Sequence, residues 1–509
     1  MEWGMLSIAL AYFFATSVGL GVYIQRKYIR YGADFTIAGR RLPWWLAMAG
    51  LTLTPFGVGN SLALSESSWI WGASVLWWMI VGSGLLIAFL MIGPGKWFRR
   101  LGVPTFAHGM EVMFDERYRV LAAIQSLVCW LGIASLEMYG CSGALFGFTG
   151  LPWEYCMAFA CVLYIIYVLF SGTMQMAVLN FMNIFVIYGL LAASFIGLTG
   201  FLGPVGGWVG AEQLIVKRLG AWATTLVPPD KFGAILLGLI LPILICHTAA
   251  CSTNQGFLQP LLGARSEKAV RQGWAVGMTI NVFWGYMWTL FGLLAIALPA
   301  TLYGALAPVI ESLRAMPGVT GAVPATIITI MQLPFVSALG ALLALMAATI
   351  STGGAFILGN ATTIAEDLVK RYIKPDISEK SFLILERILV VVFALLALGA
   401  ALMKPYILGS FLWVWIFAIP TFVCMMAGFL WLRNAKAAWW TTIIGWVVNV
   451  LWLLFSPVVT ATLPWWMHPP YGGMYPVTIL SVILYVALTM AWRGQSKPGL
   501  LRIPSQEVK

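Results

Sequence analysis

Long apolar stretches, separated by short polar gaps, follow one another along nearly the whole chain. Most of them reach about 20 residues, the length that a helix needs to cross the hydrocarbon core of a bilayer. The pattern predicts an all-α polytopic membrane protein with about 13 transmembrane helices. The expected segments are 4–25, 43–65, 70–93, 119–149, 153–173, 176–203, 233–260, 269–298, 333–369, 381–402, 406–432, 437–457 and 473–492.

The second expected segment is interrupted over residues 52–61. Pro55 removes a backbone donor and disfavours helical geometry in the residue before it. Gly57 permits an open backbone and the close approach of a ligand. Carbonyl groups freed near Leu53 and Phe56 are suited to a small cation, and the amides that begin the second half-helix are suited to an anionic group. An ordinary proline kink remains the alternative interpretation.

The seventh expected segment is interrupted over residues 246–256. Four hydrogen-bonding side chains stand in a row there, beside a glycine: Ser252, Thr253, Asn254 and Gln255. Hydrogen bonds between neighbouring helices are the simpler role for such residues. Lipid satisfies no backbone polar group, however, so an interrupted helix persists only where it lines a polar cavity.

One interruption opens each of two groups of five helices, 43–203 and 233–432. Because five is odd, the second group crosses the membrane in the direction opposite to the first. Paired interruptions in inverted repeats are typical of a secondary transporter whose site lies near the bilayer midplane. The sequence therefore predicts a 5+5 inverted repeat with two broken helices.

Composition and charge agree with a membrane protein. Hydrophobic residues make up 61% of the 509 residues, charged residues only 9%, and the mean hydropathy is +0.91, which excludes an ordinary soluble domain. The net charge is +11, but the basic residues lie in the gaps between apolar segments, so we expect a lipid bilayer and no nucleic acid as partner. On this segmentation 24 of the 29 Lys and Arg residues fall on one side. That asymmetry predicts a multi-pass protein of the cytoplasmic (inner) membrane with its N-terminus outside and its C-terminus in the cytoplasm.

The ninth expected segment, 333–369, contains a third group of oxygen donors. Ser351 and Thr352 offer two hydroxyl oxygens, and Ala348 lies one helical turn before Thr352, where it is able to add a carbonyl. Several oxygens without a fixed charge suit a hard monovalent cation. Hydrogen bonds from both hydroxyls back to their own helix are the alternative.

Three strings of residues, in order along the chain, resemble the sodium:solute symporter family. They are Asp34-Phe35-Thr36-Ile37-Ala38-Gly39-Arg40-Arg41-Leu42-Pro43-Trp44-Trp45, Asn254-Gln255 followed by Gly263-Ala264-Arg265-Ser266, and the run from Ser351-Thr352 through Asn360 to Tyr372. The segment count also resembles that family. The resemblance implies an extra N-terminal helix and linker in 1–33, a ten-helix transport core in 34–432, and two further helices with a short tail in 433–509.

The resemblance implies a LeuT-like fold and sodium-coupled import of a small organic solute by alternating access. It also implies that Na⁺, as the coupling ion, is held by the carbonyls of Leu53, Phe56 and Ala348 and by the hydroxyls of Ser351 and Thr352. The family's second sodium site uses a Thr-Asp pair, but Asn180 stands at the matching position here. A single sodium ion per cycle is therefore expected.

The residues expected to bind the solute come from both breaks and from one acid inside the membrane, because intramembrane charges are costly and usually functional. They are Gly57, Asn60, Glu137, Ser252, Thr253 and Asn254. His247 is more simply a core histidine bonded to a carbonyl. Trp69, Trp71 and Trp413 offer faces for a cation cage, but positions in the interfacial aromatic belt explain them as well.

Three alternatives remain open. In the first, a transporter of the same fold is coupled to protons through Glu137. In the second, the same fold transports its solute without any coupling ion. In the third, the protein is a transporter-like solute sensor. A membrane enzyme is disfavoured because ionisable groups inside the expected segments are scarce. Likewise, no nucleotide-binding motif supports transport driven by ATP.

Overall fold

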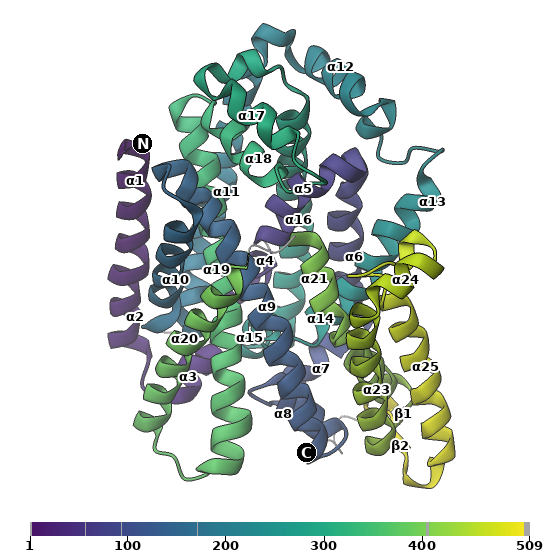
Figure 1. Ribbon diagram of the computed structural model, residues 1–509. Helices are drawn as coiled ribbons and strands as arrows, with labels where there is room; N and C mark the ends of the chain where they lie inside the picture. Colours follow the sequence, from purple (N-terminus) through teal and green to yellow (C-terminus); the bar gives the residue numbers. More distant parts are fainter. Residues whose placement is uncertain (1–2, 56, 93, 171, 404–406, 503–509) are drawn as a thin grey trace.

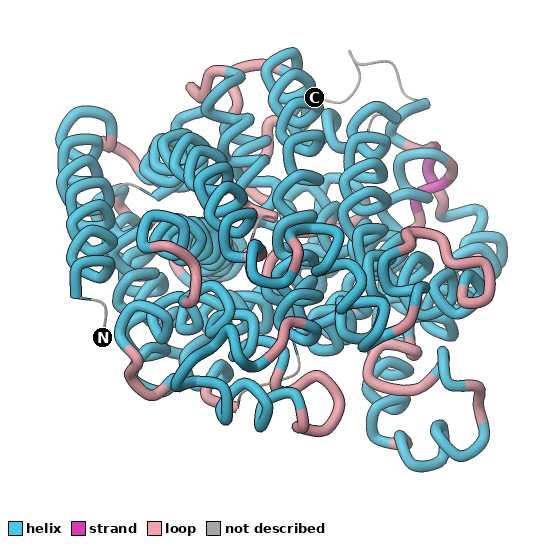
Figure 2. Tube along the Cα trace, turned by 90° about the horizontal axis from the view of Figure 1, so that it is seen from above, coloured by secondary structure: helices cyan, strands magenta, loops and turns pink. Residues whose placement is uncertain are grey.

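The computed structural model describes residues 3–55, 57–92, 94–170, 172–403 and 407–502 as a bundle of helices (Figures 1 and 2). The first half of the chain forms α1 (Trp3–Phe14), α2 (Gly21–Tyr28), α3 (Gly32–Ile37), α4 (Trp44–Leu53), α5 (Leu62–Trp71), α6 (Trp77–Ile92), α7 (Pro94–Leu101), α8 (Phe106–Met113), α9 (Glu116–Thr149), α10 (Trp153–Leu169), α11 (Gly172–Phe201), α12 (Gly207–Leu219) and α13 (Phe232–Ile235).

The second half forms α14 (Thr248–Ser252), α15 (Gln255–Gly263), α16 (Glu267–Ala297), α17 (Ala307–Arg314), α18 (Ala322–Met331), α19 (Phe335–Thr362), α20 (Glu379–Ala401), α21 (Ile407–Ile416), α22 (Ala418–Leu430), α23 (Ala435–Leu454), α24 (Ser456–Thr462) and α25 (Met474–Ala491). Four π-helical stretches extend these helices: Ala15–Leu20, Leu236–Ile240, Ile243–His247 and Thr363–Ile373. Two short strands, β1 (Leu432–Arg433) and β2 (Lys497–Pro498), pair antiparallel.

Ten helices among the described residues are long and apolar enough to span a membrane, and the bent pair Gly409–Ile416 and Ala418–Leu430 adds an eleventh. The expected count of thirteen is therefore not confirmed. Two features account for the difference. The stretch Val58–Phe89 is counted as one long apolar span, although Gly72 (φ +57°) separates α5 from α6 within it. In addition, α10 is only 17 residues long.

Helix α19 forms the centre of the bundle. It packs against α9 and α11 along its length, and nearly all of its residues are buried. By contrast, no more than about a third of the apolar span in each of α20, α23 and α25 is buried, as suits helices that face lipid on one side. The first helices, α1 and α2, lie at the left edge in both views (Figures 1 and 2). The protein thus buries its α19 oxygen donors as far from lipid as the fold allows.

Local sequence explains where several long helices begin. A side-chain oxygen of Asp115, Ser266, Ser378 or Asn434 accepts a hydrogen bond from the backbone amide three residues later, at the first turn of α9, α16, α20 and α23. Such caps satisfy amide groups that the helix itself leaves unpaired.

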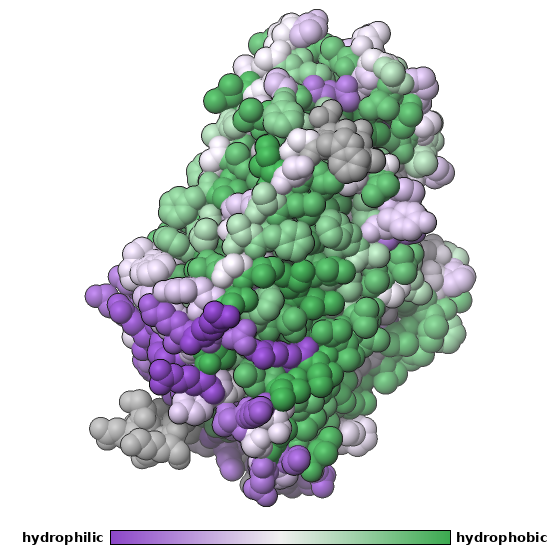
Figure 3. All heavy atoms as spheres, turned by 90° about the vertical axis from the view of Figure 1, so that its left-hand side faces the viewer, coloured by the Kyte–Doolittle hydropathy of each residue, from purple (hydrophilic) through white to green (hydrophobic). Residues whose placement is uncertain are grey.

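Hydrophilic residues gather at the lower end of the face in Figure 3, and apolar residues cover the region above it.

A network of ion pairs joins α8, α9 and the end of the α19 segment. Arg119, which is 5% exposed, lies 2.8 Å from Asp367 and 2.6 Å from Glu111. Thr105 donates a further hydrogen bond of 2.7 Å to Asp367, and Arg371 lies 2.9 Å from Glu111. Because a buried charge that loses its partner is costly, this network holds the three helices in a fixed relation.

His108 on α8 gives this region a pH dependence. Burial, together with the charge of Arg119, lowers the pKa of His108 below its usual 6.5. The unfolded chain therefore binds a proton more readily than the folded one, so stability falls as the pH drops through about 6.5. We expect the melting temperature to fall between pH 7.5 and pH 5.5, and to fall less in His108→Gln. An identical slope in the two proteins would contradict this.

Candidate functional site

The first break lies between α4, which ends at Leu53, and α5. A short 3₁₀ turn, Val58–Asn60, fills the gap. The Asn60 side chain donates to the Pro55 carbonyl, and its backbone amide donates to the Gly57 carbonyl at 3.1 Å. The break therefore satisfies much of its own backbone, as a stable interruption inside a membrane must.

The 3₁₀ turn of the first break contacts the carboxyl group of Glu137. The Val58 amide donates to Glu137 Oε2 at 2.7 Å, and Glu137 is 1% exposed. A Cβ atom added to Gly57 would lie only 2.0 Å from the same oxygen. Gly57 is thus required by the close approach of α9. The sequence predicted that these amides would face an anionic group, and a carboxyl group of the chain itself lies there.

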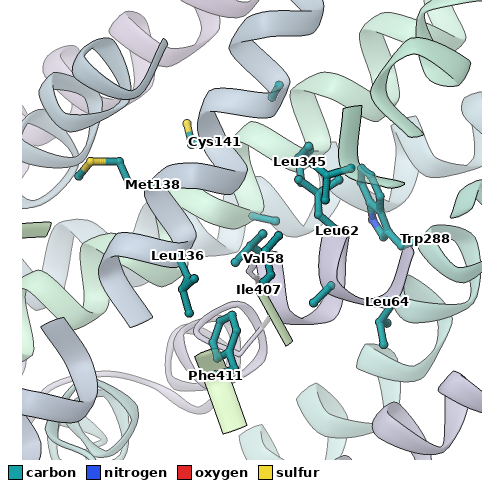
Figure 4. Packing of buried hydrophobic residues seen from close by; sticks show 14 of the residues in the cluster. Val58, Leu62, Leu64, Leu136, Met138, Cys141, Trp288, Leu345, Ile407 and Phe411 are labelled. Atoms are coloured by element: carbon teal, nitrogen blue, oxygen red, sulfur yellow. The ribbon is translucent and has the colours of Figure 1, made fainter. Parts of the chain in front are cut away.

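Apolar side chains pack around this turn. Val58 lies beside Ile407 and Phe411 of α21, with Leu136 of α9 nearby (Figure 4). Gly140 of α9 also approaches closely, since a Cβ there would lie 2.5 Å from a methyl group of Val58. The break is therefore fixed between α9 and α21 by packing as well as by hydrogen bonds.

Four oxygen atoms converge where α4 ends against α19. Ser351 Oγ lies 2.7 Å from the Ala348 carbonyl oxygen and 3.4 Å from that of Leu53. Thr352 Oγ1 lies 3.0 Å from each of the same two carbonyl oxygens. The hydroxyls do bond back to their own helix, as the alternative interpretation expected, yet they also reach across to the broken helix. The fifth expected oxygen belongs to Phe56, which lies outside the described residues.

The second break separates α14 from α15. The Asn254 side chain caps α15 by accepting from the Gly256 amide at 2.7 Å, and the Thr253 hydroxyl donates to the Ala249 carbonyl at 2.9 Å. Ser252 Oγ and Asn254 Nδ2 are buried and have no hydrogen-bond partner within the described part of the chain. The break exists as predicted, but its polar side chains largely serve the backbone.

A small cavity of about 30 Å³ lies between the two breaks and α19. Gly59, Asn60 and Glu137 line it, and so does Thr352, which also belongs to the oxygen cluster. Ser252, Thr253 and Asn254 are not among its lining residues, and neither is Gly57, which lies against Glu137. The remaining described lining residues include seven rings from six elements: Trp78, Trp130, His247, Phe257, Phe356, Phe411 and Trp415.

Sequence reasoning missed these rings. Trp69, Trp71 and Trp413, considered for a cage, do not line the cavity. No spacing in the sequence distinguishes Trp78 or Trp415 from them. The one available signal was the position of His247 beside the second break. Its ring forms a triangle with the indoles of Trp78 and Trp415, whose centroids lie 6.0 and 5.1 Å from it and 5.6 Å from each other.

A family model for the sodium:solute symporter family matches residues 35–445. The chain belongs to this family. It is 21% identical over 497 residues to the sodium/glucose cotransporter of Vibrio parahaemolyticus, a match that covers 93% of the chain and 89% of that protein. It is 22% identical over 498 residues to sodium/glucose cotransporter 4 of Danio rerio, covering 90% of the chain and 72% of that protein.

The structure resembles the substrate-bound, outward-open state of a Na⁺-coupled sialic acid symporter. The TM-score is 0.73 at 16% identity, and the match covers 97% of this chain and 99% of that one. The predicted LeuT-like helical fold is thereby confirmed. Family membership confirms a sodium-coupled importer of a small solute, embedded in a membrane, with Na⁺ as the coupling ion; the chain is not an enzyme.

Proposed function

We propose that the coupling Na⁺ binds among the oxygens of Leu53, Phe56, Ala348, Ser351 and Thr352. The observation that carries this assignment is the convergence of four of them, with Thr352 Oγ1 at 3.0 Å from two carbonyl oxygens on different helices. Carbonyl and hydroxyl oxygens are the ligands that hard cations prefer. An ion at this place bridges the broken helix to α19 and so favours one arrangement of the two.

The solute site in this proposal is the cavity between the breaks. Thr352 contributes to both the oxygen cluster and the cavity wall, which gives ion and solute a shared residue. Gly57, Asn60 and Glu137 shape the cavity from the first break and α9. Ser252, Thr253 and Asn254 act through the backbone of the second break. At about 30 Å³ the cavity is far smaller than ordinary ligand sites, so the solute is bound only after the surrounding helices separate.

The proposal includes topology and organisation. Residues 34–432 form the transport core, with 1–33 before it and 433–509 after it. The protein lies in the cytoplasmic membrane with its N-terminus outside. The uneven distribution of Lys and Arg supports this orientation, since cytoplasmic loops carry the excess of basic residues. Each Na⁺ that enters with a neutral solute gains about 2.3 kcal/mol per 100 mV.

Uptake by purified protein in proteoliposomes tests this function. An inward sodium gradient should drive accumulation of a labelled solute found by a binding screen, and an interior-negative potential should increase it. An equal gradient of K⁺ or protons serves as the control. Uptake that follows the proton gradient and ignores sodium would overturn the proposal.

We further propose that one sodium ion is transported per cycle. Asn180 supplies no charge, and its Oδ1 accepts from the Tyr167 hydroxyl at 2.7 Å. The same hydroxyl accepts from Asn183 at 3.2 Å, so this oxygen is already part of a local network. Initial uptake rates plotted against sodium concentration should give a Hill coefficient near 1. A coefficient approaching 2 would contradict a single site.

A further inference from the structure

We infer that the transported solute carries a positively charged nitrogen, held between aromatic faces beside Glu137. This inference rests on the proposed solute site and deepens it by naming the substrate class. It comes from the chemistry of the cavity walls, which offer π-faces and one carboxyl group. Among the described residues that line the cavity, none is Lys or Arg.

The aromatic walls come from elements that are far apart in the sequence. In one group, the Trp78 and Trp415 rings lie with centroids 5.6 Å apart, and Phe411 lies 5.2 Å from Trp415. In a second group, Trp130 of α9 and Phe356 of α19 lie 4.6 Å apart. Aromatic faces attract cations through the ring quadrupole, and cages of several rings recognise methylated ammonium groups.

Glu137 supplies the single acidic group among the described residues that line the cavity. Its Oε2 accepts from the Val58 amide, which places the carboxyl group against the 3₁₀ turn of the first break. Freed backbone amides of a broken helix are where the carboxylate of an anionic solute would otherwise be bound. Glu137 therefore occupies the anion position itself and leaves a site that favours a cation.

Two further groups in the walls suggest what else the solute carries. The indole Nε1 atoms of Trp130 and Trp415 are buried and have no hydrogen-bond partner among the residues that the structure describes. The Trp78 Nε1, by contrast, donates to Asn60 Oδ1 at 2.6 Å. A buried donor without an acceptor is costly. A hydroxyl or carbonyl oxygen on the solute would satisfy these donors, so a small ammonium compound with one oxygen-bearing arm fits best.

Thermal-shift titrations of the purified protein in sodium buffer test the inference with a matched pair of probes. Choline has a trimethylammonium group and a hydroxyl, and 3,3-dimethylbutan-1-ol has the same shape without the charge. We expect choline to stabilise the protein and the alcohol to bind at least about tenfold more weakly. Glucose serves as the neutral polyol and should give no shift. A protein that ignores choline, or responds equally to the alcohol or to glucose, overturns the inference.

Variants separate this result from general damage. Glu137→Gln retains an amide oxygen for the Val58 amide, yet it should weaken choline binding about tenfold or more. Trp415→Phe should keep choline binding better than Trp415→Leu. Sodium alone should still stabilise all three variants. If sodium stabilises the wild type but choline does not, the substrate class is wrong; if sodium has no effect on the wild type, the proposed ion site is wrong instead.

Discussion

Replacing Ser351 and Thr352 together by alanine should abolish sodium-driven uptake. Both hydroxyls lie within 3.4 Å of the Leu53 carbonyl, so the double variant removes two of the oxygens that surround the proposed ion. Each lost hydroxyl–ion contact costs about 1.5–3 kcal/mol, which together corresponds to a decrease in sodium affinity of about 100-fold or more. Sodium-dependent thermal stabilisation measures the loss of sodium affinity, and initial uptake rates measure the loss of sodium-driven transport.

A matched control lies further along the same helical segment. The Thr363 hydroxyl is buried and donates to the Gly359 carbonyl of its own helical segment at 2.9 Å, and in the described structure it makes no hydrogen bond to the first broken helix. Thr363→Ala should therefore keep its sodium response. Without sodium the double variant should melt somewhat lower than Thr363→Ala, because it also loses the hydrogen bonds to the Leu53 carbonyl, so the sodium-dependent shift of each variant is the quantity to compare. A double variant that retained wild-type sodium affinity would place the ion elsewhere.

The features that the sequence predicted well are local ones. Pro55 and Gly57 interrupt a helix by their own backbone chemistry, and Asn254 caps the next helix within two residues. Spacing of one turn also places Ala348, Ser351 and Thr352 on one face of α19. These signals need no knowledge of the partner helix, and the breaks that they predicted are present.

The cavity walls depend instead on how whole helices are rotated about their axes. A helix such as α9 or α19 carries polar residues but no continuous polar stripe, so its sequence does not indicate which face is directed inward. Trp78, Trp130 and Trp415 therefore look in the sequence like any other tryptophan near lipid. The same lack of a directional signal explains why Ser252 was expected at the cavity wall although it does not line the cavity.

The expected helix count was not confirmed for a related reason. Apolar runs show where chain is buried in lipid or protein, but they do not show where a helix bends. Gly72 ends α5 through a positive φ angle, and a Cβ at this position would lie 2.5 Å from the backbone of Ala223 in a distant segment. That requirement comes from a tertiary contact, so the sequence pattern placed the boundary between these two segments early, at residues 65–70.

Substituting Gly57 by alanine should inactivate transport and destabilise the fold. The new methyl group would lie 2.0 Å from Glu137 Oε2, so either the break or the carboxyl group must move. Overpacking of this kind costs about 1–3 kcal/mol, and the Val58 amide would lose its acceptor at a further cost of about 1–3 kcal/mol. We expect a clearly lower melting temperature and no measurable sodium-dependent uptake.

Two companion variants show whether this clash is the cause. Gly84→Ala on α6 adds a methyl group with no other atom within 4 Å, so its melting temperature and uptake should match the wild type. Gly57→Ala combined with Glu137→Ala removes the obstructing carboxyl group, and should regain part of the lost stability without regaining transport. If Gly57→Ala alone transported normally, the close contact between the first break and α9 would not be what shapes the site. Recovery of transport in the double variant would show that the carboxyl group of Glu137 is dispensable. The first break would then bind the solute without it.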